Sequence, residues 1–177
     1  MIFDRQFAMP NSETFSLPPV ARLLEKWLPY RNTNPVIVDP FSRNSKWATV
    51  TNDLNPDTEA QFHLHAEEFV LMDFKADAVL FDPPYSPRQV QEVYQQIGRT
   101  VTMQDTQNGS MNRKVKDGLD RMLKPDGIAI CCGWNSMGFG LKRGYEMLEI
   151  LLVTHGGAHN DTIVTVERKI VPATLFD

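Results

Sequence analysis

Short apolar runs recur along the 177-residue chain and constrain its fold more than any other feature. Residues 36–38 (VIV), 77–81 (DAVLF) and 127–132 (GIAICC) are rich in apolar side chains and are hardly interrupted by polar ones. Such runs are typical of strands that are buried on both faces of a parallel sheet. Residues 47–51 (WATVT) predict another strand close to the first. Segments that are compatible with helices or loops separate these runs.

Two further segments complete the predicted architecture. From Pro18, the sequence PPVARLLEKWL places apolar residues on one helical face, which predicts an amphipathic helix that ends near Pro29. Residues 149–154 and 161–167 flank a glycine pair and predict an antiparallel hairpin. The sequence therefore predicts a Rossmann-like α/β fold, in which helices cover both faces of a mostly parallel sheet closed by a C-terminal antiparallel hairpin.

Length and composition narrow the class of protein. A chain of this length suits one domain, so we expect residues 1–177 to form a single unit. No apolar run approaches the ~20 residues that span a bilayer, and the N-terminal residues lack the apolar core of a signal peptide. We therefore expect a cytoplasmic protein. The net charge of −4 argues against a strongly basic nucleic-acid coat, so any contact with nucleic acid is expected to be local.

The most specific motif is Asp-Pro-Pro-Tyr at residues 82–85, directly after a predicted buried strand. Its prolines fix φ and remove two backbone donors, so the turn is stiff and its carbonyls can accept hydrogen bonds. Asp82 and the Pro83 carbonyl can receive both hydrogens of a planar amino group, while Tyr85 stacks on the attached ring. The alternative is a proline-rich turn that precedes a helix. Because ligands of open α/β sheets bind at strand ends, the position favours a site.

This motif belongs to a wider resemblance. The chain resembles S-adenosylmethionine-dependent amino-methyltransferases that modify N6 of adenine or N4 of cytosine in DNA, whose DPPY-type motif follows the fourth strand. It more closely resembles compact DNA N6-adenine methyltransferases of bacteriophages and mobile elements. The resemblance covers nearly the whole chain and includes no long insertion of the kind that forms a separate target-recognition domain. It is carried by the segments MPNSETFSLPP, VDPFSRNSKWATVTNDLNP, LFDPPYSPRQV, CCGWNS and HGGAHNDTI.

The resemblance implies residues that bind S-adenosylmethionine. Asp53 matches the acid that binds the ribose hydroxyls, and Asp73 matches a position beside the cofactor adenine. Thr14 and Phe15 resemble a segment that packs on the methionine end. Residues that match the start of the cofactor loop are Asp39, Pro40 and Phe41. The catalytic residues implied by the motif are Asp82, Pro83, Pro84 and Tyr85.

One departure from the family pattern leaves two alternatives open. The two glycines of a DPFxGxG loop would fall at Arg43 and Ser45. Either the loop takes a less tight path and Arg43 pairs with the methionine carboxylate of the cofactor, or the site has lost its cofactor. An arginine–carboxylate contact would be charge-assisted. Because the acidic residues and the DPPY motif occur together, we favour cofactor binding.

The resemblance implies methyl transfer from S-adenosylmethionine to the N6 amino group of adenine in DNA. Asp82 and the Pro83 carbonyl would direct the nitrogen lone pair toward the methyl group, and transfer would depend on positioning and electrostatics. The motif alone accepts cytosine N4 equally well. The alternatives are an amino-methyltransferase that acts on RNA or a protein amide, and a catalytically silent relative that binds nucleic acid or protein.

Few segments of the sequence could supply contacts with DNA. Residues 98–114 are polar and lack strong periodicity, so we expect a mobile loop. The weakness of the basic patch suggests a homodimer or a partner subunit that assists target recognition. The residues that could meet phosphates are Arg88, Arg99, Arg113, Lys114, Lys116, Lys142 and Arg143.

The histidines offer a rival site. His63 and His65 would share one strand face, and His155 and His159 flank a glycine turn, so the two pairs could bind zinc. No spacing brings the pairs together, and we expect no metal. His155 and His159 are instead expected near the substrate or in a structural turn.

Overall fold

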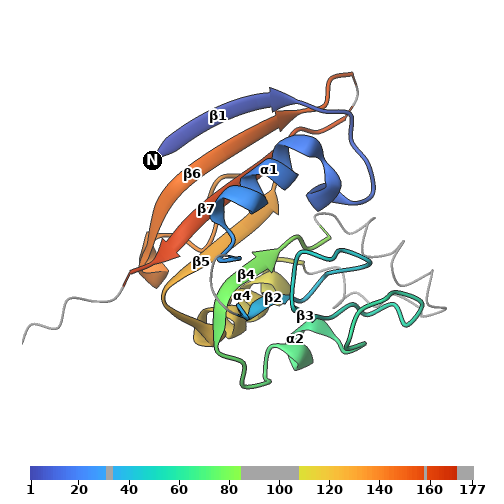
Figure 1. The fold of residues 1–177 in the computed structure, drawn as a ribbon, viewed down its shortest axis with the longest axis vertical. Coiled ribbons are helices and arrows are strands. Elements are labelled where there is room, and N and C mark those ends of the chain that lie inside the picture. Colours follow the sequence, from blue (N-terminus) through green and yellow to red (C-terminus); the bar gives the residue numbers. More distant parts are fainter. Residues whose placement is uncertain (31–33, 85–107, 158, 171–177) are drawn as a thin grey trace, which may run out of the picture.

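The computed structural model describes residues 1–30, 34–84, 108–157 and 159–170 (Figure 1). The strands form a seven-stranded sheet in the order β1-β6-β7-β5-β4-β2-β3. β7 runs antiparallel to its neighbours β5 and β6, and the other neighbouring strands are parallel. The predicted sheet and its C-terminal hairpin are therefore confirmed. The elements are β1 (Ile2–Phe7), η1 (Thr14–Ser16), α1 (Pro18–Trp27), β2 (Ile37–Asp39), β3 (Val50–Thr51), α2 (Ala66–Phe69), β4 (Ala76–Phe81), α4 (Asn108–Met122), β5 (Leu123–Gly133), η2 (Leu141–Arg143), β6 (Tyr145–Thr154) and β7 (Thr162–Lys169).

Helix α1 covers one face of the sheet. It begins with two prolines, which suit the first turn because backbone N–H groups there have no intrahelical acceptor and their loss costs no hydrogen bond. Its buried residues Val20, Leu23 and Leu24 belong to a core with Leu151 and Val153 of β6. That core also contains residues of β4, β5 and β7, so one amphipathic helix joins the parallel part of the sheet to the hairpin.

Helices α2 and α4 cover the other face. Phe69 of α2 and Leu119 of α4 are fully buried and share a core with Val79 of β4 and Ala129 of β5. Alternate residues of β4 and β5 therefore enter opposite cores, as expected for central strands. The predicted covering of the sheet by helices on both faces is confirmed.

The parallel strands bring polar residues to one edge of the sheet. The carboxyl ends of β2, β3, β4 and β5 all point the same way, because these strands are parallel. We call this side the carboxyl edge. Asp39 ends β2, Asp82 follows β4 and Trp134 follows β5. The fold therefore gathers residues that are far apart in the sequence.

Two parts of the chain differ from the sequence prediction. Strand β1 was not predicted; it pairs in parallel with β6 and forms one edge of the sheet. Residues 108–114, which were expected to lie in a mobile loop, form the first part of helix α4, and residues 98–107 lie outside the described residues. None of the helices in the described ranges has both the length and the hydrophobicity that a membrane crossing requires.

Candidate functional site

Asp82 lies at the centre of the carboxyl edge. It follows the last residue of β4 and is half-buried. Burial raises the pKa of its carboxyl to about 6, while a hydrogen bond with Thr14 and the positive charge of Arg43 oppose this rise. The negative charge of Glu13 adds to it. The structure thus brings the predicted catalytic acid close to two residues predicted to bind the cofactor.

Asp39 supplies a buried carboxylate on the neighbouring strand. Its side chain is fully buried, and Oδ1 accepts a hydrogen bond from the backbone N–H of Phe41 at 2.9 Å. Oδ2 has no hydrogen-bond partner among the described residues. Burial raises the pKa of Asp39 well above its usual range, and the carboxylates of Asp82 and Asp53 add to the rise. A buried acceptor without a partner is costly, so this atom is suited to a cationic ligand.

The loop after β2 is fixed to the residues that follow β3. The backbone N–H of Ser42 donates to the carbonyl of Asn52 at 2.9 Å. Both carboxylate oxygens of Asp53 accept backbone hydrogen bonds, Oδ2 from Arg43 at 3.1 Å and Oδ1 from Asn55 at 2.9 Å. Each of these oxygens retains a second acceptor position. Asp53 therefore holds the loop in place and can still accept from a ligand hydroxyl.

The backbone at Arg43 shows which conformation the loop adopts at a position where the family pattern has glycine. Arg43 has a φ of +49°, the left-handed conformation that glycine adopts without strain. The backbone N–H of Ser45 donates to the Ser42 carbonyl at 2.8 Å, which closes a turn around this residue. The expected less tight path is therefore wrong at Arg43, because the loop keeps a tight left-handed turn with an arginine at that position.

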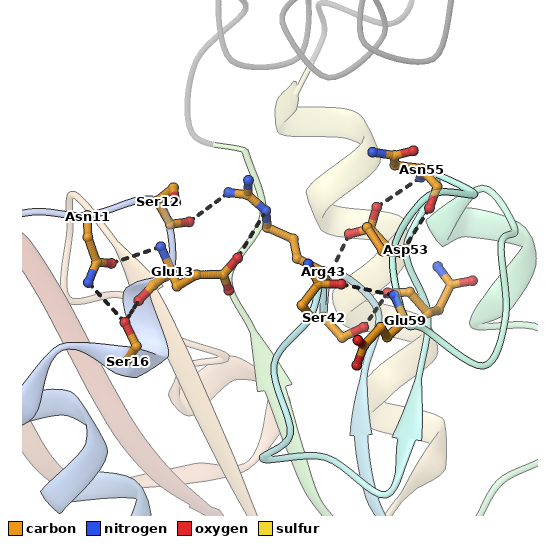
Figure 2. Close-up of polar contacts among 12 residues, drawn as sticks. Asn11, Ser12, Glu13, Ser16, Ser42, Arg43, Asp53, Asn55 and Glu59 are labelled. Atoms are coloured by element: carbon orange, nitrogen blue, oxygen red, sulfur yellow. Dashed lines mark hydrogen bonds and ion pairs between the residues drawn. The ribbon is translucent and has the colours of Figure 1, made fainter.

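The Arg43 side chain reaches the N-terminal segment (Figure 2). Its Nη1 donates to the Ser12 carbonyl at 2.6 Å, and its Nε lies 3.6 Å from Oε1 of Glu13. These contacts tie the segment before η1 to the loop after β2. In this arrangement the guanidinium is engaged by residues of the chain itself, and the predicted contact with a methionine carboxylate stays a prediction.

We expect Arg43→Gly to be more stable than Arg43→Ala by about 1 kcal/mol. Both variants lose the contacts with Ser12 and Glu13, whereas only the alanine variant keeps the cost of a side chain at positive φ. Urea denaturation of the two variants measures the difference. Equal stabilities, or a more stable alanine variant, would show that residue 43 does not adopt the left-handed conformation.

Other predicted site residues occupy different environments. Phe15 is almost fully buried in the core beneath α1, so it supports the segment that carries Thr14. Pro40 is buried, and the Phe41 ring packs edge-on against Phe81 at a centroid distance of 5.8 Å. Pro83 is buried and Pro84 is half-buried, whereas Tyr85 lies outside the described residues.

The structure does not bring Asp73 to this site. Asp73 lies between α2 and the first residue of β4, which places it toward the opposite edge of the sheet from Asp82. Its side chain is 85% exposed and forms an ion pair with Lys75 at 2.6 Å. The segment that lies next to the end of β3 is instead residues 62–65, because Phe62 forms a parallel bridge with Asn52. The resemblance implied that Asp73 lies beside the cofactor adenine, and its position in the fold corrects this assignment.

Asn52 is a site residue that the sequence analysis missed. It is 1% exposed, and its side-chain amide donates to the carbonyls of Pro40 and Leu64 at 3.1 Å each. Its Oδ1 accepts from the Leu64 backbone N–H at 3.0 Å. Asn52 thereby joins the loop after β2 to the segment after Phe62. Its position at a strand end, directly before Asp53, could have identified it from the sequence.

Most described basic residues that were expected to meet phosphates have acidic partners or buried contacts. Arg143 pairs with Asp117 at 2.8 Å, and Lys114 pairs with Glu67 at 3.1 Å. Arg113 lies 4.0 Å from the other Asp117 oxygen. Lys116 donates to the Gly138 carbonyl at 2.5 Å. Lys142 is exposed, and Arg88 and Arg99 lie outside the described residues. Pairing of this kind reduces the charge available to a polyanion.

The histidine at the hairpin has a structural environment. His155 is 3% exposed, and its ring nitrogens contact the Ala8 carbonyl at 2.7 Å and the Thr162 hydroxyl at 2.8 Å. It therefore joins the ends of β1 and β6 to the start of β7. Within the described ranges, no group of three or more His, Cys, Asp or Glu side chains is arranged to hold a metal ion.

Comparisons with known proteins identify the fold. No protein-family model matches the chain, and no curated protein matches it. Among solved structures, NSun6 from Pyrococcus horikoshii with SFG has a TM-score of 0.57 at 13% identity, over 85% of this chain and 50% of that one. This chain thus spans about half the length of that protein.

Two other solved structures match along most of both chains. Precorrin-6y C5,15-methyltransferase from Geobacter metallireducens GS-15 has a TM-score of 0.58 at 13% identity, over 93% of this chain and 94% of that one. The N-methyltransferase NodS from Bradyrhizobium japonicum WM9, in complex with S-adenosyl-L-homocysteine, has a TM-score of 0.52 at 10% identity, over 90% and 93%. The chain therefore has the Rossmann-like methyltransferase fold.

Proposed function

We propose that this protein transfers a methyl group from S-adenosylmethionine to the N6 amino group of adenine in DNA. The observation that carries the proposal is the pair of carboxylates on adjacent strands: Asp39, whose Oδ2 lacks a partner among the described residues, and Asp82, which begins the Asp-Pro-Pro turn. The fold supports the choice of S-adenosylmethionine as the methyl donor. The DPPY motif and the sequence resemblance to bacteriophage adenine methyltransferases support the choice of the adenine amino group as the methyl acceptor.

The residues around Asp39 fit S-adenosylmethionine. This cofactor carries a sulfonium, an ammonium and one carboxylate, so its net charge is positive. Asp39 is fully buried and Asp53 nearly so, and the carboxylates of Asp53, Asp82 and Glu13 each add to the raised pKa of Asp39. Oδ2 of Asp39 can accept from the ammonium, and Asp53 can accept from a ribose hydroxyl. The bound cofactor would supply an electrophilic methyl group.

Asp82 and the Pro83 carbonyl would orient the acceptor. An aromatic amino group is a weak nucleophile because its lone pair is delocalised into the ring. Hydrogen bonds from its two hydrogens to Asp82 and Pro83 would favour a pyramidal nitrogen and direct the lone pair toward the methyl group. The new C–N bond forms as the S–C bond breaks, and the nitrogen then loses one proton. No metal ion is needed for this reaction.

The rate of methyl transfer is expected to rise with pH through about 6, because burial raises the pKa of Asp82 to about 6 and its ionised form is the stronger acceptor for the amino hydrogen that is directed to it. The stability effect has the opposite sign. A carboxyl whose folded-state pKa lies above 3.8 stabilises the fold at low pH, and this contribution is lost as pH rises through about 6. Initial rates and thermal unfolding at the same pH values separate the two effects. A rate that is flat from pH about 5 to about 7 contradicts the assignment.

A planar amine outside DNA is the second candidate acceptor. Arg143 and Lys114 have acidic partners, and the carboxylates of Glu13, Asp53 and Asp82 all add to the raised pKa of Asp39, so acidic groups gather at this edge. That charge distribution favours an acceptor with few phosphates, such as a protein amide, or a partner subunit that supplies basic contacts. Incubation with labelled S-adenosylmethionine and unmethylated DNA, RNA or protein tests the substrate class. We expect label in DNA, and label found in RNA or protein alone would refute this choice.

A catalytically silent binding protein is the remaining alternative. Its support in the sequence was the absence of glycine from the loop after β2. The left-handed turn at Arg43 weakens that support, because the backbone keeps the conformation that glycine would give. Calorimetric titration with S-adenosylmethionine tests it directly. We expect saturable binding, and the absence of heat at millimolar cofactor would favour the silent protein.

A further inference from the structure

Trp134 leaves the sheet beside the Asp-Pro-Pro turn. The parallel register of β4 and β5 pairs Phe81 with Cys131. Pro84 and Trp134 each lie three residues beyond that pair, so both follow adjacent strand ends at the carboxyl edge. Trp134 is 48% exposed, which is a large aromatic surface for a residue that directly follows a buried strand.

Asp82 and Trp134 are expected to lie on the same face of the sheet. Leu80, Ile130 and Cys132 belong to the core on the α1 face, and alternate residues of a strand share a face. Asp82 follows Leu80 by two positions, and Trp134 follows Cys132 by two. Burial raises the pKa of Cys132, and the carboxylate of Asp82 adds to the rise, which places these two groups near each other.

A buried glutamate fixes the connection that follows Trp134. Glu167 of β7 is 1% exposed and accepts backbone hydrogen bonds from Phe139 at 2.5 Å and Gly140 at 2.8 Å. Gly138 has a φ of +51°, and a Cβ atom at this position would collide with the Glu167 carboxylate. The connection from β5 to η2 is therefore held against the α4 face of the sheet.

The same connection is linked to β4. Lys116 of α4 donates to the Gly138 carbonyl, and its Nζ lies 5.2 Å from the centre of the Phe81 ring. The Phe81 ring also packs edge-on against Phe139 at 6.4 Å. Because Phe81 directly precedes Asp82, these contacts fix the connection relative to the Asp-Pro-Pro turn.

We propose that Trp134 stacks on the aromatic ring that bears the target amino group, and that Glu167 positions Trp134 through the Gly138–Phe139–Gly140 turn. This inference rests on the proposed function, because it assigns a further contact to the same acceptor. Indole is well suited to this role because it offers a large flat surface to any base. Trp134 would bind the ring similarly before and during transfer, so its contribution falls mainly on the KM for the acceptor.

The test uses the full chain, S-adenosylmethionine and a single-stranded oligodeoxynucleotide that contains adenine. Trp134→Ala is expected to lower kcat/KM for the oligodeoxynucleotide by about 10- to 100-fold, mostly through KM, as lost base stacking predicts. The affinity for S-adenosylmethionine should stay within about twofold of wild type, because no cofactor contact is removed. Trp134→Phe should recover most of the loss. The matched control is Met137→Ala, a 75% exposed residue of the same connection, which should change neither quantity.

Glu167 is tested as a positioning residue. Glu167→Gln should raise the KM for the oligodeoxynucleotide without changing the affinity for S-adenosylmethionine. If Glu167 acts through Trp134, the same substitution in the Trp134→Ala background should cause little further loss. A full additional loss in the double variant would refute this route.

The possible results separate this inference from the function on which it rests. Absence of methyl transfer by the wild-type protein would overturn both. Methyl transfer by wild type with an unchanged kcat/KM in Trp134→Ala would overturn the stacking role alone. If Trp134→Ala fails to fold, Trp134→Leu keeps an apolar side chain but removes the aromatic face, and wild-type kcat/KM in that variant would equally overturn the proposal.

Discussion

Replacing Asp82 by alanine is expected to reduce methyl transfer by about 100- to 1,000-fold, the range for loss of one group that stabilises a transition state. Asp82 is assigned to the acceptor amino group, so the affinity for S-adenosylmethionine should change little. The Thr14 hydrogen bond to Asp82 is also lost, and thermal unfolding must therefore be measured alongside the rate. Single-turnover methyl transfer with saturating cofactor measures the chemical effect.

The chain offers a matched control for Asp82. Asp73 is an exposed acid that lies toward the other edge of the sheet, and Asp73→Ala removes the same charge far from the turn. It should leave both methyl transfer and cofactor affinity unchanged. Equal rates for Asp82→Ala and wild type would remove Asp82 from the mechanism, whereas a large loss in Asp73→Ala would restore its predicted cofactor role.

Asp39→Asn is expected to weaken S-adenosylmethionine binding by about 10- to 100-fold, which corresponds to the ~1.5–3 kcal/mol of a hydrogen bond to a charged group. Asparagine can keep the Oδ1 contact with the Phe41 N–H, but it replaces the unpartnered Oδ2 with a donor and removes the negative charge. The protein without cofactor should not lose stability at neutral pH, because a buried charge that lacks a full set of partners is removed. Calorimetric titration and urea denaturation measure the two effects.

For the assignment to hold, Asp39→Asn must weaken cofactor binding without lowering the stability of the protein. Weaker cofactor binding with retained stability identifies Asp39 as a ligand-binding acid. Unchanged affinity would remove Asp39 from the cofactor site. A parallel loss of stability would instead identify it as a structural residue of the loop after β2.

Local sequence patterns predicted most of the sheet because central strands are buried on both faces. The apolar runs at residues 77–81 and 127–132 became β4 and β5, and the amphipathic pattern from Pro18 became α1. β1 could not be predicted in the same way. Its residues are largely exposed, and it is a strand because it pairs with β6, at positions such as Ile2 with Glu149. Such pairing depends on contacts that are distant in the sequence.

The candidate site was predicted where a residue directly follows a strand. Asp39, Asp53 and Asp82 reach the carboxyl edge because each ends or follows a strand of the parallel sheet. The resemblance misplaced Asp73 because helix α2 and a turn lie between β3 and β4, and they carry Asp73 to the start of β4. The backbone conformation of Arg43 could not be predicted from its residue type either, because two hydrogen bonds hold it: the Arg43 N–H donates to Asp53, and the Ser45 N–H donates to the Ser42 carbonyl.

The central claim is that this chain methylates N6 of adenine in DNA with Asp82 as the acceptor-binding acid. Mass spectrometry of nucleosides tests it most directly, after unmethylated DNA is incubated with S-adenosylmethionine and either wild-type or Asp82→Ala protein. We predict N6-methyldeoxyadenosine with the wild-type protein and almost none with the variant. N4-methyldeoxycytidine would contradict the choice of base, and equal methylation by both proteins would contradict the role of Asp82. Absence of methylated nucleosides with a wild-type protein that binds the cofactor would contradict the claim that DNA is the substrate.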